Sequence, residues 1–296
     1  MNRIQTRRAL AGLAAVILGA GLLAGCGGSG GNDEPAATGA SAPLFDQLPQ
    51  KFQDSKVIEV GSDIAYAPME YYDTDGETVL GFDKELTLAL SEQLGVTFDW
   101  NNATFDGLIT QLKSGKIDVA ISGMSDTKDR QSEVDFVDYY VAGAMILVKK
   151  GNPEGIQSLA DLCGKTIAVQ RGTTQEGYAQ EQSAKCDEPI QILSFDRETE
   201  AMLQVKNGRA VAGMQDYPVA TYNARTSGGG NDFEVVGDQI QAGPLGIAVG
   251  KDDTGLRDAL QKALQAIIDD GTYAALIKKY ETPLGAVESA TINAGS

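Results

Sequence analysis

Polar side chains that could hold a small molecule follow a buried segment near the middle of the chain. Residues 117–121 form a compact apolar run with one acid, and the sequence SGMSDTKDR comes directly after it. Hydroxyl groups, backbone groups and a guanidinium can all form hydrogen bonds with a polar ligand. On residue type alone, the arginine could also be a surface charge or half of a structural ion pair. The candidate residues in this loop are Ser122, Gly123, Ser125, Thr127 and Arg130.

Three further loops carry polar side chains just after a predicted strand. Each of these loops also has a structural interpretation. The threonines could cap the helix that follows them, Asp216 could cap a helix that begins near Pro218, and Asp63 could simply close a turn. The candidates are Asp63, Tyr66 and Glu70 after strand 57–60, Arg171, Thr173 and Thr174 after strand 166–170, and Asp216 after strand 210–213.

The elements around these loops can be predicted from the spacing of apolar residues. From Phe105 to Leu112, apolar residues recur at the i, i+3, i+4, i+7 spacing of one buried helical face, and Gly115 follows where a left-handed cap is expected. The run 117–121 is typical of a buried strand. In open α/β sheets, ligands bind at the carboxyl ends of the strands, which is where the loop to Arg130 begins.

Strands and helices alternate along the chain, and the alternation starts again after Asn152. This pattern predicts an α/β protein with two doubly wound lobes and a cleft, since the chain is also longer than a usual single domain. The run 144–148 predicts a buried strand, Gly143 before it marks an expected crossing between the lobes, and 247–249 is the expected return crossing. The expected boundaries are 51–142 with 244–285 for lobe 1, 143–243 for lobe 2, and 286–296 for a tail.

Composition argues against several classes of function. The formal net charge is −17, or −20 once Arg3, Arg7 and Arg8 are subtracted, so we expect no binding to nucleic acid or directly to an anionic membrane surface. The chain contains no histidine, so it cannot form a Ser/His/Asp triad, a His-based zinc site or a Cys/His pair. We therefore expect no metal, no cofactor and no catalytic residue.

The N-terminus predicts export. Residues 1–25 combine a basic start with a long apolar run, which is typical of a signal that is removed. The sequence LAGC ending at Cys26 resembles the lipobox of bacterial lipoproteins, where the cysteine is lipidated; the alternative is an ordinary signal with an incidental cysteine. Thr6–Leu10 resembles a twin-arginine signal, so both export routes stay open. Residues 26–50, rich in small and polar residues, predict a lipidated flexible tether.

Two cysteines remain once Cys26 is assigned to the lipobox. In an exported protein, Cys163 and Cys186 predict a disulfide that closes a loop of about 23 residues. Two free buried thiols are the alternative.

Several motifs together resemble one family. In their order, and over about 230 residues, they are similar to the polar amino-acid-binding lipoproteins and periplasmic proteins of ABC importers, solute-binding protein family 3. The resemblance implies a fold like the type II periplasmic binding proteins, whose two lobes close on a free amino acid. The sequence departs from the family at Met69, Lys84 and Asp126. The motifs are GFDKELTLAL from Gly81, FDGLITQLKSGKIDVAISGMS ending at Ser125, TKDR ending at Arg130, VDFVDYY from Val134, LCGKTIAVQRGTTQE from Leu162 and GTYAALIKKY from Gly271.

The same resemblance implies how the two ends of an amino acid would be bound. Arg130 would bind the α-carboxylate, because a guanidinium presents a planar two-pronged donor that matches it. Asp216 would bind the α-ammonium group. Ser125 and Thr174 would add hydrogen bonds to the carboxylate, one from each lobe, and the N-terminus of the following helix also suits an anion. The backbone groups expected to help are those of Ser122, Gly123 and Thr173.

The side chain of the amino acid would face Asp63 and Tyr66, with Tyr66 stacking on it. Asp63 suits a cationic side chain or an amide donor, so the resemblance favours a basic or amide side chain. Glutamate stays open if Arg171 turns inward, and Glu70 and Arg171 are expected only at the rim.

The expected function is therefore transport-related binding and not catalysis. The protein would be a monomer, lipid-anchored on the outer face of the cell membrane, that captures a polar L-amino acid and delivers it to an ABC permease. Three alternatives stay open: a dehydratase of small cyclic acids on the same fold, a sensory ligand-binding module, and a structural cell-surface protein.

Overall fold

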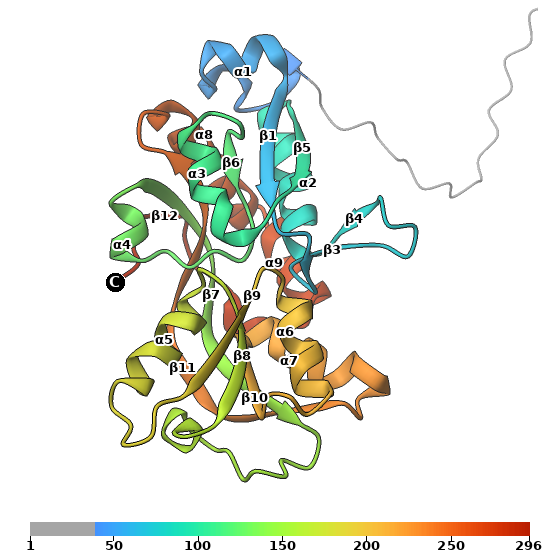
Figure 1. Cartoon of the computed structure of the whole chain (residues 1–296). Helices are drawn as coiled ribbons and strands as arrows, with labels where there is room; N and C mark the ends of the chain where they lie inside the picture. Colours follow the sequence, from blue (N-terminus) through green and yellow to red (C-terminus); the bar gives the residue numbers. More distant parts are fainter. Residues whose placement is uncertain (1–38) are drawn as a thin grey trace, which may run out of the picture. The chain divides into compact units, whose positions relative to one another are not determined.

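The computed structural model describes residues 39–296. The predicted export signal, Cys26 and the first part of the predicted tether lie outside the described residues. Helices and strands alternate in the described part, and the predicted α/β class is confirmed (Figure 1).

Two long antiparallel strands, β7 (Val134–Lys149) and β11 (Phe233–Gly250), lie at the centre of a nine-stranded sheet. The strand order is β5-β1-β6-β11-β7-β10-β8-β9, and β12 pairs with β7. A second, antiparallel sheet has the order β2-β3-β4. The remaining strands are β1 (Val57–Ser62), β2 (Ala65–Tyr66), β3 (Glu70–Tyr72), β4 (Val79–Leu80), β5 (Thr97–Asn102), β6 (Val119–Ala120), β8 (Thr166–Gln170), β9 (Gln191–Phe195), β10 (Ala212–Asp216) and β12 (Thr291–Ile292).

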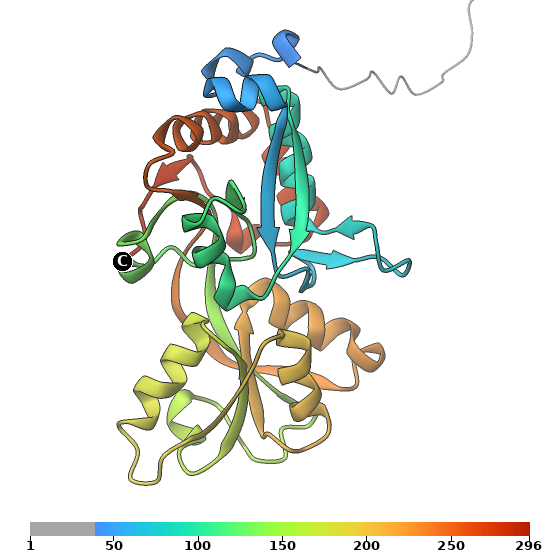
Figure 2. The same ribbon diagram turned by 45° about the horizontal axis from the view of Figure 1, so that its top comes forward.

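The helices cover these strands (Figure 2). In Figure 1, α1, α2, α3 and α8 surround β1, β5 and β6, whereas α5, α6 and α7 surround β8, β9 and β10. Six short 3-10 helices, η1 to η6, lie in the connections. The α-helices are α1 (Gln50–Ser55), α2 (Phe82–Leu94), α3 (Leu108–Lys113), α4 (Lys128–Gln131), α5 (Thr174–Ser183), α6 (Glu198–Lys206), α7 (Tyr217–Thr226), α8 (Thr254–Asp269) and α9 (Thr272–Lys279).

Helix α8 shows how the sequence specifies these elements. Its apolar residues recur every three or four positions, from Leu256 through Leu260 and Leu264 to Ile267, and all four are buried. This spacing gives one continuous apolar face, which packs against α2. Helix α2 ends at Gly95, whose φ of 67° is the left-handed conformation that glycine adopts at low cost.

The buried apolar side chains form four clusters, which divide the described residues into two halves. Two clusters draw on residues 42–142 and 245–290, with Val219 added. The other two draw on residues 144–236. We call these the larger half and the smaller half. Strands β7 and β11 pass through both, so one continuous sheet joins the halves.

Several predicted elements differ from the structure in extent. The predicted strand 144–148 is only part of β7, because the residues VDFVDYY from Val134 are buried as well and belong to the same strand. The two predicted sheets are therefore one sheet. The predicted strand 117–121 is reduced to the two-residue β6, and the predicted helix from Phe105 is a 3-10 turn, η3 (Phe105–Gly107), followed by α3.

Both ends of the described chain also differ from the prediction. Residues 39–50 were expected to be tether, but Phe45 and Leu48 are buried in the larger half. Residues 286–296 were expected to be a tail, but they contain β12, and the Gly295 N–H donates to Asp126 Oδ2 at 2.7 Å. In both segments, a few apolar side chains or backbone groups form contacts that the polar composition of the segment does not predict.

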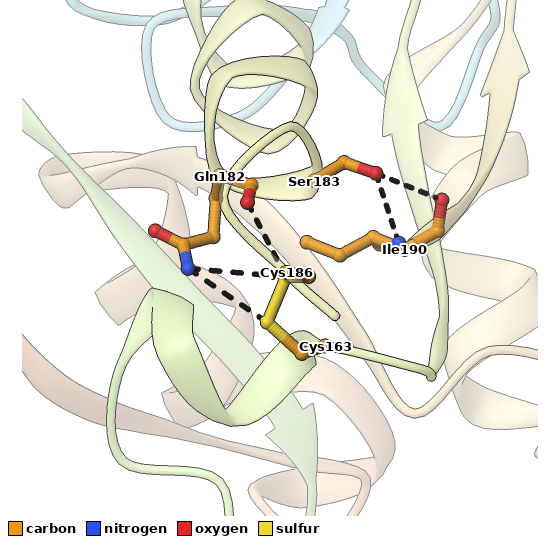
Figure 3. Close-up of a disulfide and its surroundings, with 5 residues drawn as sticks. All are labelled: Cys163, Gln182, Ser183, Cys186 and Ile190. Carbon is orange, nitrogen blue, oxygen red and sulfur yellow. Dashed lines mark hydrogen bonds between the residues drawn. A yellow bond between two sulfur atoms is a disulfide. The ribbon is translucent and has the colours of Figure 1, made fainter. Parts of the chain in front are cut away.

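The predicted disulfide between Cys163 and Cys186 is present (Figure 3). It joins the end of η4 (Leu159–Leu162) to the residues just after α5, and the two Cα atoms are 5.5 Å apart. The side-chain amide of Gln182 lies 3.8 and 3.9 Å from the two sulfurs. The bond therefore fixes the C-terminal end of α5 to the preceding connection.

Replacing both cysteines, Cys163→Ser with Cys186→Ser, should lower the free energy of unfolding by about 3 kcal/mol, because a cross-link over this loop length restricts the unfolded chain. Urea unfolding of the exported protein, with and without a reductant, measures this. The reductant should destabilise the unaltered protein and leave the double variant unchanged. Equal stability of the two oxidised proteins would contradict the prediction.

Candidate ligand-binding site

A cavity with an empty volume of about 310 Å³ lies where residues of the larger and smaller halves meet. All nine residues predicted for a binding site line it, together with three that were not predicted. The predicted ones are Asp63, Tyr66, Ser122, Gly123, Ser125, Arg130, Thr173, Thr174 and Asp216, and the others are Phe105, Gln170 and Gln175.

The topology explains why residues so distant in sequence come together. Strands β1 and β6 are parallel and end in the loops that carry Asp63 and Ser122. Strands β8 and β10 are parallel to each other and end just before Thr173 and at Asp216. The carboxyl ends of the two pairs of strands thus supply the two sides of one cavity.

Arg130 is fixed with its guanidinium in the cavity. Its Nη1 donates to the Ser125 carbonyl at 2.8 Å, and its Nη2 donates to the Gly172 carbonyl, in the other half, at 3.0 Å. The guanidinium lies 5.3 Å from the centre of the Phe105 ring. Burial lowers the pKa of Arg130 to about 10, so the group stays cationic at neutral pH. Within residues 39–296, its side-chain hydrogen bonds go to carbonyl oxygens and none goes to a carboxylate.

Hydrogen-bond donors surround this cation. Thr174 begins α5, and the first backbone N–H groups of a helix have no partner within the helix. The helix N-terminus also carries partial positive charge. The Ser125 and Thr174 hydroxyl oxygens, one from each half, are 3.4 Å apart. Together with Arg130, these groups form a pocket for an anion.

Asp216 provides the opposite charge. Its Oδ2 accepts from the Tyr66 hydroxyl at 2.9 Å, and its Oδ1 accepts from Gln175 Nε2 at 2.9 Å. Burial raises the pKa of Asp216 to about 6, and the Tyr66 bond and the charge of Arg130 limit that rise. At neutral pH the site therefore holds a buried carboxylate that is oriented but not neutralised by a directly paired cation.

Tyr66 contributes differently from the prediction. It was expected to stack on a ligand side chain, and it does line the cavity, but its hydroxyl joins the two halves by bonding Asp216. The same hydroxyl accepts from the Asp216 backbone N–H at 2.9 Å. Burial, with the nearby Asp216 charge, raises the pKa of Tyr66 well above its usual value, so it remains a donor. Tyr66 thus positions the carboxylate.

Ser122, Gly123 and Thr173 direct most of their polar groups into the protein. The Ser122 hydroxyl accepts from the Asp63 N–H and donates to Glu70 Oε1, each at 3.0 Å. The Gly123 N–H, expected to face a ligand, instead donates to Asp83 at 3.3 Å. The Thr173 hydroxyl caps α5 by accepting from a backbone N–H. The helix-capping alternative therefore holds for Thr173, and all three residues line the cavity.

Two residues expected at the rim lie elsewhere. Glu70 is fully buried behind the cavity, next to Asp83, and burial raises the pKa of both carboxyl groups, that of Asp83 to about 6. Arg171 is half exposed and contacts Asp196 and the Ser194 carbonyl. Neither residue lines the cavity.

Asp63 lines the cavity but already has protein partners. Its carboxylate forms an ion pair with Arg197 and accepts a hydrogen bond from Gln170 Nε2.

Arg197 was missed by the sequence interpretation. It follows a strand, as Arg130 does, and that shared position is the signal that could have found it. Gln170 and Gln175, also missed, lie at a strand end and in the first turn of a helix.

The described residues contain neither a metal-ligand cluster nor a membrane-spanning helix. Between residues 39 and 296, no three histidine, cysteine, aspartate or glutamate side chains gather as metal ligands would. Over the same residues, no helix has both the length and the hydropathy needed to cross a membrane.

Comparisons with known proteins identify the family. The Lysine/arginine/ornithine-binding periplasmic protein of Escherichia coli (strain K12) is 33% identical over 232 residues, 76% of this chain and 87% of that protein. A solved structure of an ancestral arginine-binding protein bound to glutamine is 37% identical, with a TM-score of 0.70, covering 77% of this chain and 98% of the other. The ancestral amino acid-binding protein AncCDT-1, a precursor of cyclohexadienyl dehydratase, is 37% identical, with a TM-score of 0.71 and coverage of 78% and 97%.

The family model for bacterial extracellular solute-binding proteins, family 3, matches residues 58–283. This span contains both halves of the sheet and all the residues that line the cavity. The chain belongs to the bacterial extracellular solute-binding proteins of family 3.

Proposed function

We propose that this protein captures a free L-amino acid outside the cytoplasm and delivers it to an ABC permease. One observation carries the proposal: Arg130 and Asp216, from opposite halves, face one small cavity with opposite charges. A free α-amino acid carries a carboxylate and an ammonium group on the same carbon atom. Both of its charges then find a partner in this cavity.

The α-carboxylate binds on the Arg130 side. The guanidinium has donors left after its bonds to two carbonyls, and the hydroxyls of Ser125 and Thr174 lie beside it. The first N–H groups of α5 point to the same place. Charge-assisted hydrogen bonds of this kind are about twice as strong as neutral ones, so this end anchors the ligand.

The α-ammonium group binds Asp216. Tyr66 and Gln175 hold the two carboxylate oxygens in place, which leaves lone pairs on both for a cation. Because the carboxylate is buried, an ammonium group that replaces water as its partner gains more than it would in bulk solvent.

We infer that the two halves are lobes that close on the ligand, with boundaries at 51–142 plus 244–285 and 143–243. Hydrogen bonds already run between the halves at Tyr66–Asp216 and Arg130–Gly172. Gly172 has a φ of 73°, and a Cβ added there would lie 3.0 Å from the Asp106 Cβ across the cleft. The ligand favours closure because only the closed arrangement offers both charged ends together.

The relatives support an amino acid as the ligand. One is named for lysine, arginine and ornithine, and a structural neighbour that binds arginine was solved with glutamine. We propose a polar amino acid; the names of the relatives favour a basic or amide side chain, with glutamate as the third choice, and the partners of Asp63 decide among these. The protein acts as a monomer, and Cys26 anchors it by a lipid to the outer face of the cell membrane.

A dehydratase is the second candidate, because one structural neighbour is a precursor of such an enzyme. An acid–base catalyst with a raised pKa would be needed in the cleft. Asp216 lines the cavity with a raised pKa of about 6, but Tyr66 and Gln175 already bond its two oxygens, an arrangement that suits a held cation. Burial raises the pKa of Glu198 to about 8, but Glu198 bonds Gln215 and does not line the cavity. The cavity residues therefore favour binding over catalysis.

A panel of the twenty amino acids should contain one or more that raise the melting temperature, because a ligand at a hundred times its Kd stabilises by about 2.7 kcal/mol. Small-angle scattering with the same ligand should show a smaller radius of gyration than without it. A ligand that stabilises the protein without compaction would contradict lobe closure, and no stabilising amino acid would contradict amino-acid binding.

Arg130→Ala should weaken amino-acid binding by about thirtyfold or more, since removing one partner of a buried charge pair costs at least about 2 kcal/mol. Isothermal titration calorimetry with the best ligand of the panel measures this. Arg171→Ala is the matched control, because that arginine lies outside the cavity and bonds Asp196. An unchanged Kd for Arg130→Ala would place the carboxylate elsewhere.

Affinity should fall below pH 6. Asp216, with a pKa of about 6, must be ionised to bind the ammonium group, which lowers that pKa in the complex. The Kd is therefore constant above pH 6 and rises up to tenfold per unit as the pH falls below it. Asp216→Asn should bind weakly at every pH and lose this dependence. If the variant keeps the dependence, another group, such as Asp83, causes it.

A further inference from the structure

Asp63, which was expected to face the side chain of the ligand, forms an ion pair with Arg197. Arg197 stands just before α6 in the smaller half, and Asp63 follows β1 in the larger half. Arg197 Nη1 bonds Asp63 Oδ1, and it also donates to Asn102 Oδ1 at 3.0 Å and to the Ala103 carbonyl at 3.2 Å. The guanidinium is therefore fixed by three groups of the opposite half.

The second oxygen of Asp63 is also occupied. Gln170 Nε2 donates to Asp63 Oδ2 and, at 3.1 Å, to the Asp196 carbonyl. Only 5% of the Asp63 side chain is exposed, against 26% for Arg197. The protein itself thus supplies the cation and the amide donor that this carboxylate would otherwise take from a ligand.

The charges of the acidic and basic side chains that line the cavity, taken together with that of Arg197, then add to zero. Arg130 and Asp216 match the two charges of an amino acid, and Arg197 matches Asp63. A lysine or arginine side chain next to Asp63 would add a positive charge beside Arg197, with no anion left to balance it. A glutamate side chain would face the Asp63 carboxylate. An unbalanced charge in a buried site is strongly unfavourable.

On the basis of the proposed function, we propose that Arg197 determines specificity by neutralising Asp63, so that the cleft selects an amino acid with an uncharged polar side chain. Gln170 indicates the kind of side chain. Its amide nitrogen faces two acceptors, which fixes the amide orientation and leaves the amide oxygen, unpartnered within residues 39–296, as an acceptor. Side chains that are neutral and donate a hydrogen bond, an amide or a hydroxyl, match this arrangement.

The Arg197–Asp63 pair also joins the two halves, so a test must separate selectivity from closure. Weaker closure reduces the affinity for every amino acid by the same factor. A change in selectivity alters the ratio between a cationic and a neutral ligand. The deciding quantity is therefore the ratio of the Kd for arginine to the Kd for glutamine.

Isothermal titration calorimetry on the exported protein should give a Kd for glutamine, asparagine, serine or threonine at least tenfold lower than the Kd for arginine or lysine. Arg197→Gln should lower the arginine-to-glutamine ratio at least tenfold, because Asp63 is then free to pair with the ligand. Arg197→Lys, which keeps the charge, should retain the original ratio. The double variant Arg197→Gln with Asp63→Asn should restore it, since both charges are gone.

Three results would overturn the inference. The first is that the unaltered protein binds arginine or lysine more tightly than any neutral amino acid. The second is an arginine-to-glutamine Kd ratio that does not change in Arg197→Gln. The third is a low ratio in the double variant. Each of these leaves amino-acid binding intact. Absence of binding by all twenty amino acids to the unaltered protein would instead overturn the proposed function itself.

Discussion

The constraint on which this structure depends is the balance of charge in a nearly enclosed space. Half-buried Arg130 and buried Asp216 have opposite charges and no direct ion pair between them. Each is satisfied in part by neutral partners, namely carbonyl oxygens for the arginine, and a tyrosine and a glutamine for the aspartate. Such an arrangement is costly unless a dipolar molecule completes it. The rest of the fold positions these two groups on facing walls.

The continuous sheet makes that placement reproducible. Strands β7 and β11 run through both halves and hold them in one sheet. The carboxyl ends of β1 and β6 therefore lie opposite the carboxyl ends of β8 and β10. The disulfide lies past the end of α5 opposite to Thr174, and it secures the helix whose first turn faces the cavity. Rigid elements of this kind hold binding groups more accurately than loops alone.

The sequence was most informative where local rules apply. Apolar spacing identified α8 and β8, and the strand-end rule brought nine residues correctly to one cavity. Contacts between the halves could not be predicted in this way. Asp63 pairs with Arg197 because the loop before α6 lies against the end of β1. The spacing of residues along the chain does not predict this contact. The packing of residues 286–296 was missed for the same reason, since backbone pairing leaves little trace in composition.

If the protein delivers an amino acid to a permease as proposed, the hydrogen bond between Tyr66 and Asp216 affects that delivery. Both partners of the bond are protein groups, so it lowers the free energy of the closed form whether or not an amino acid is bound. A permease that recognises the closed form would meet empty and loaded carriers alike, in proportion to their populations. The strength of this one phenol–carboxylate bond would therefore help to determine how often a carrier without an amino acid binds to the permease.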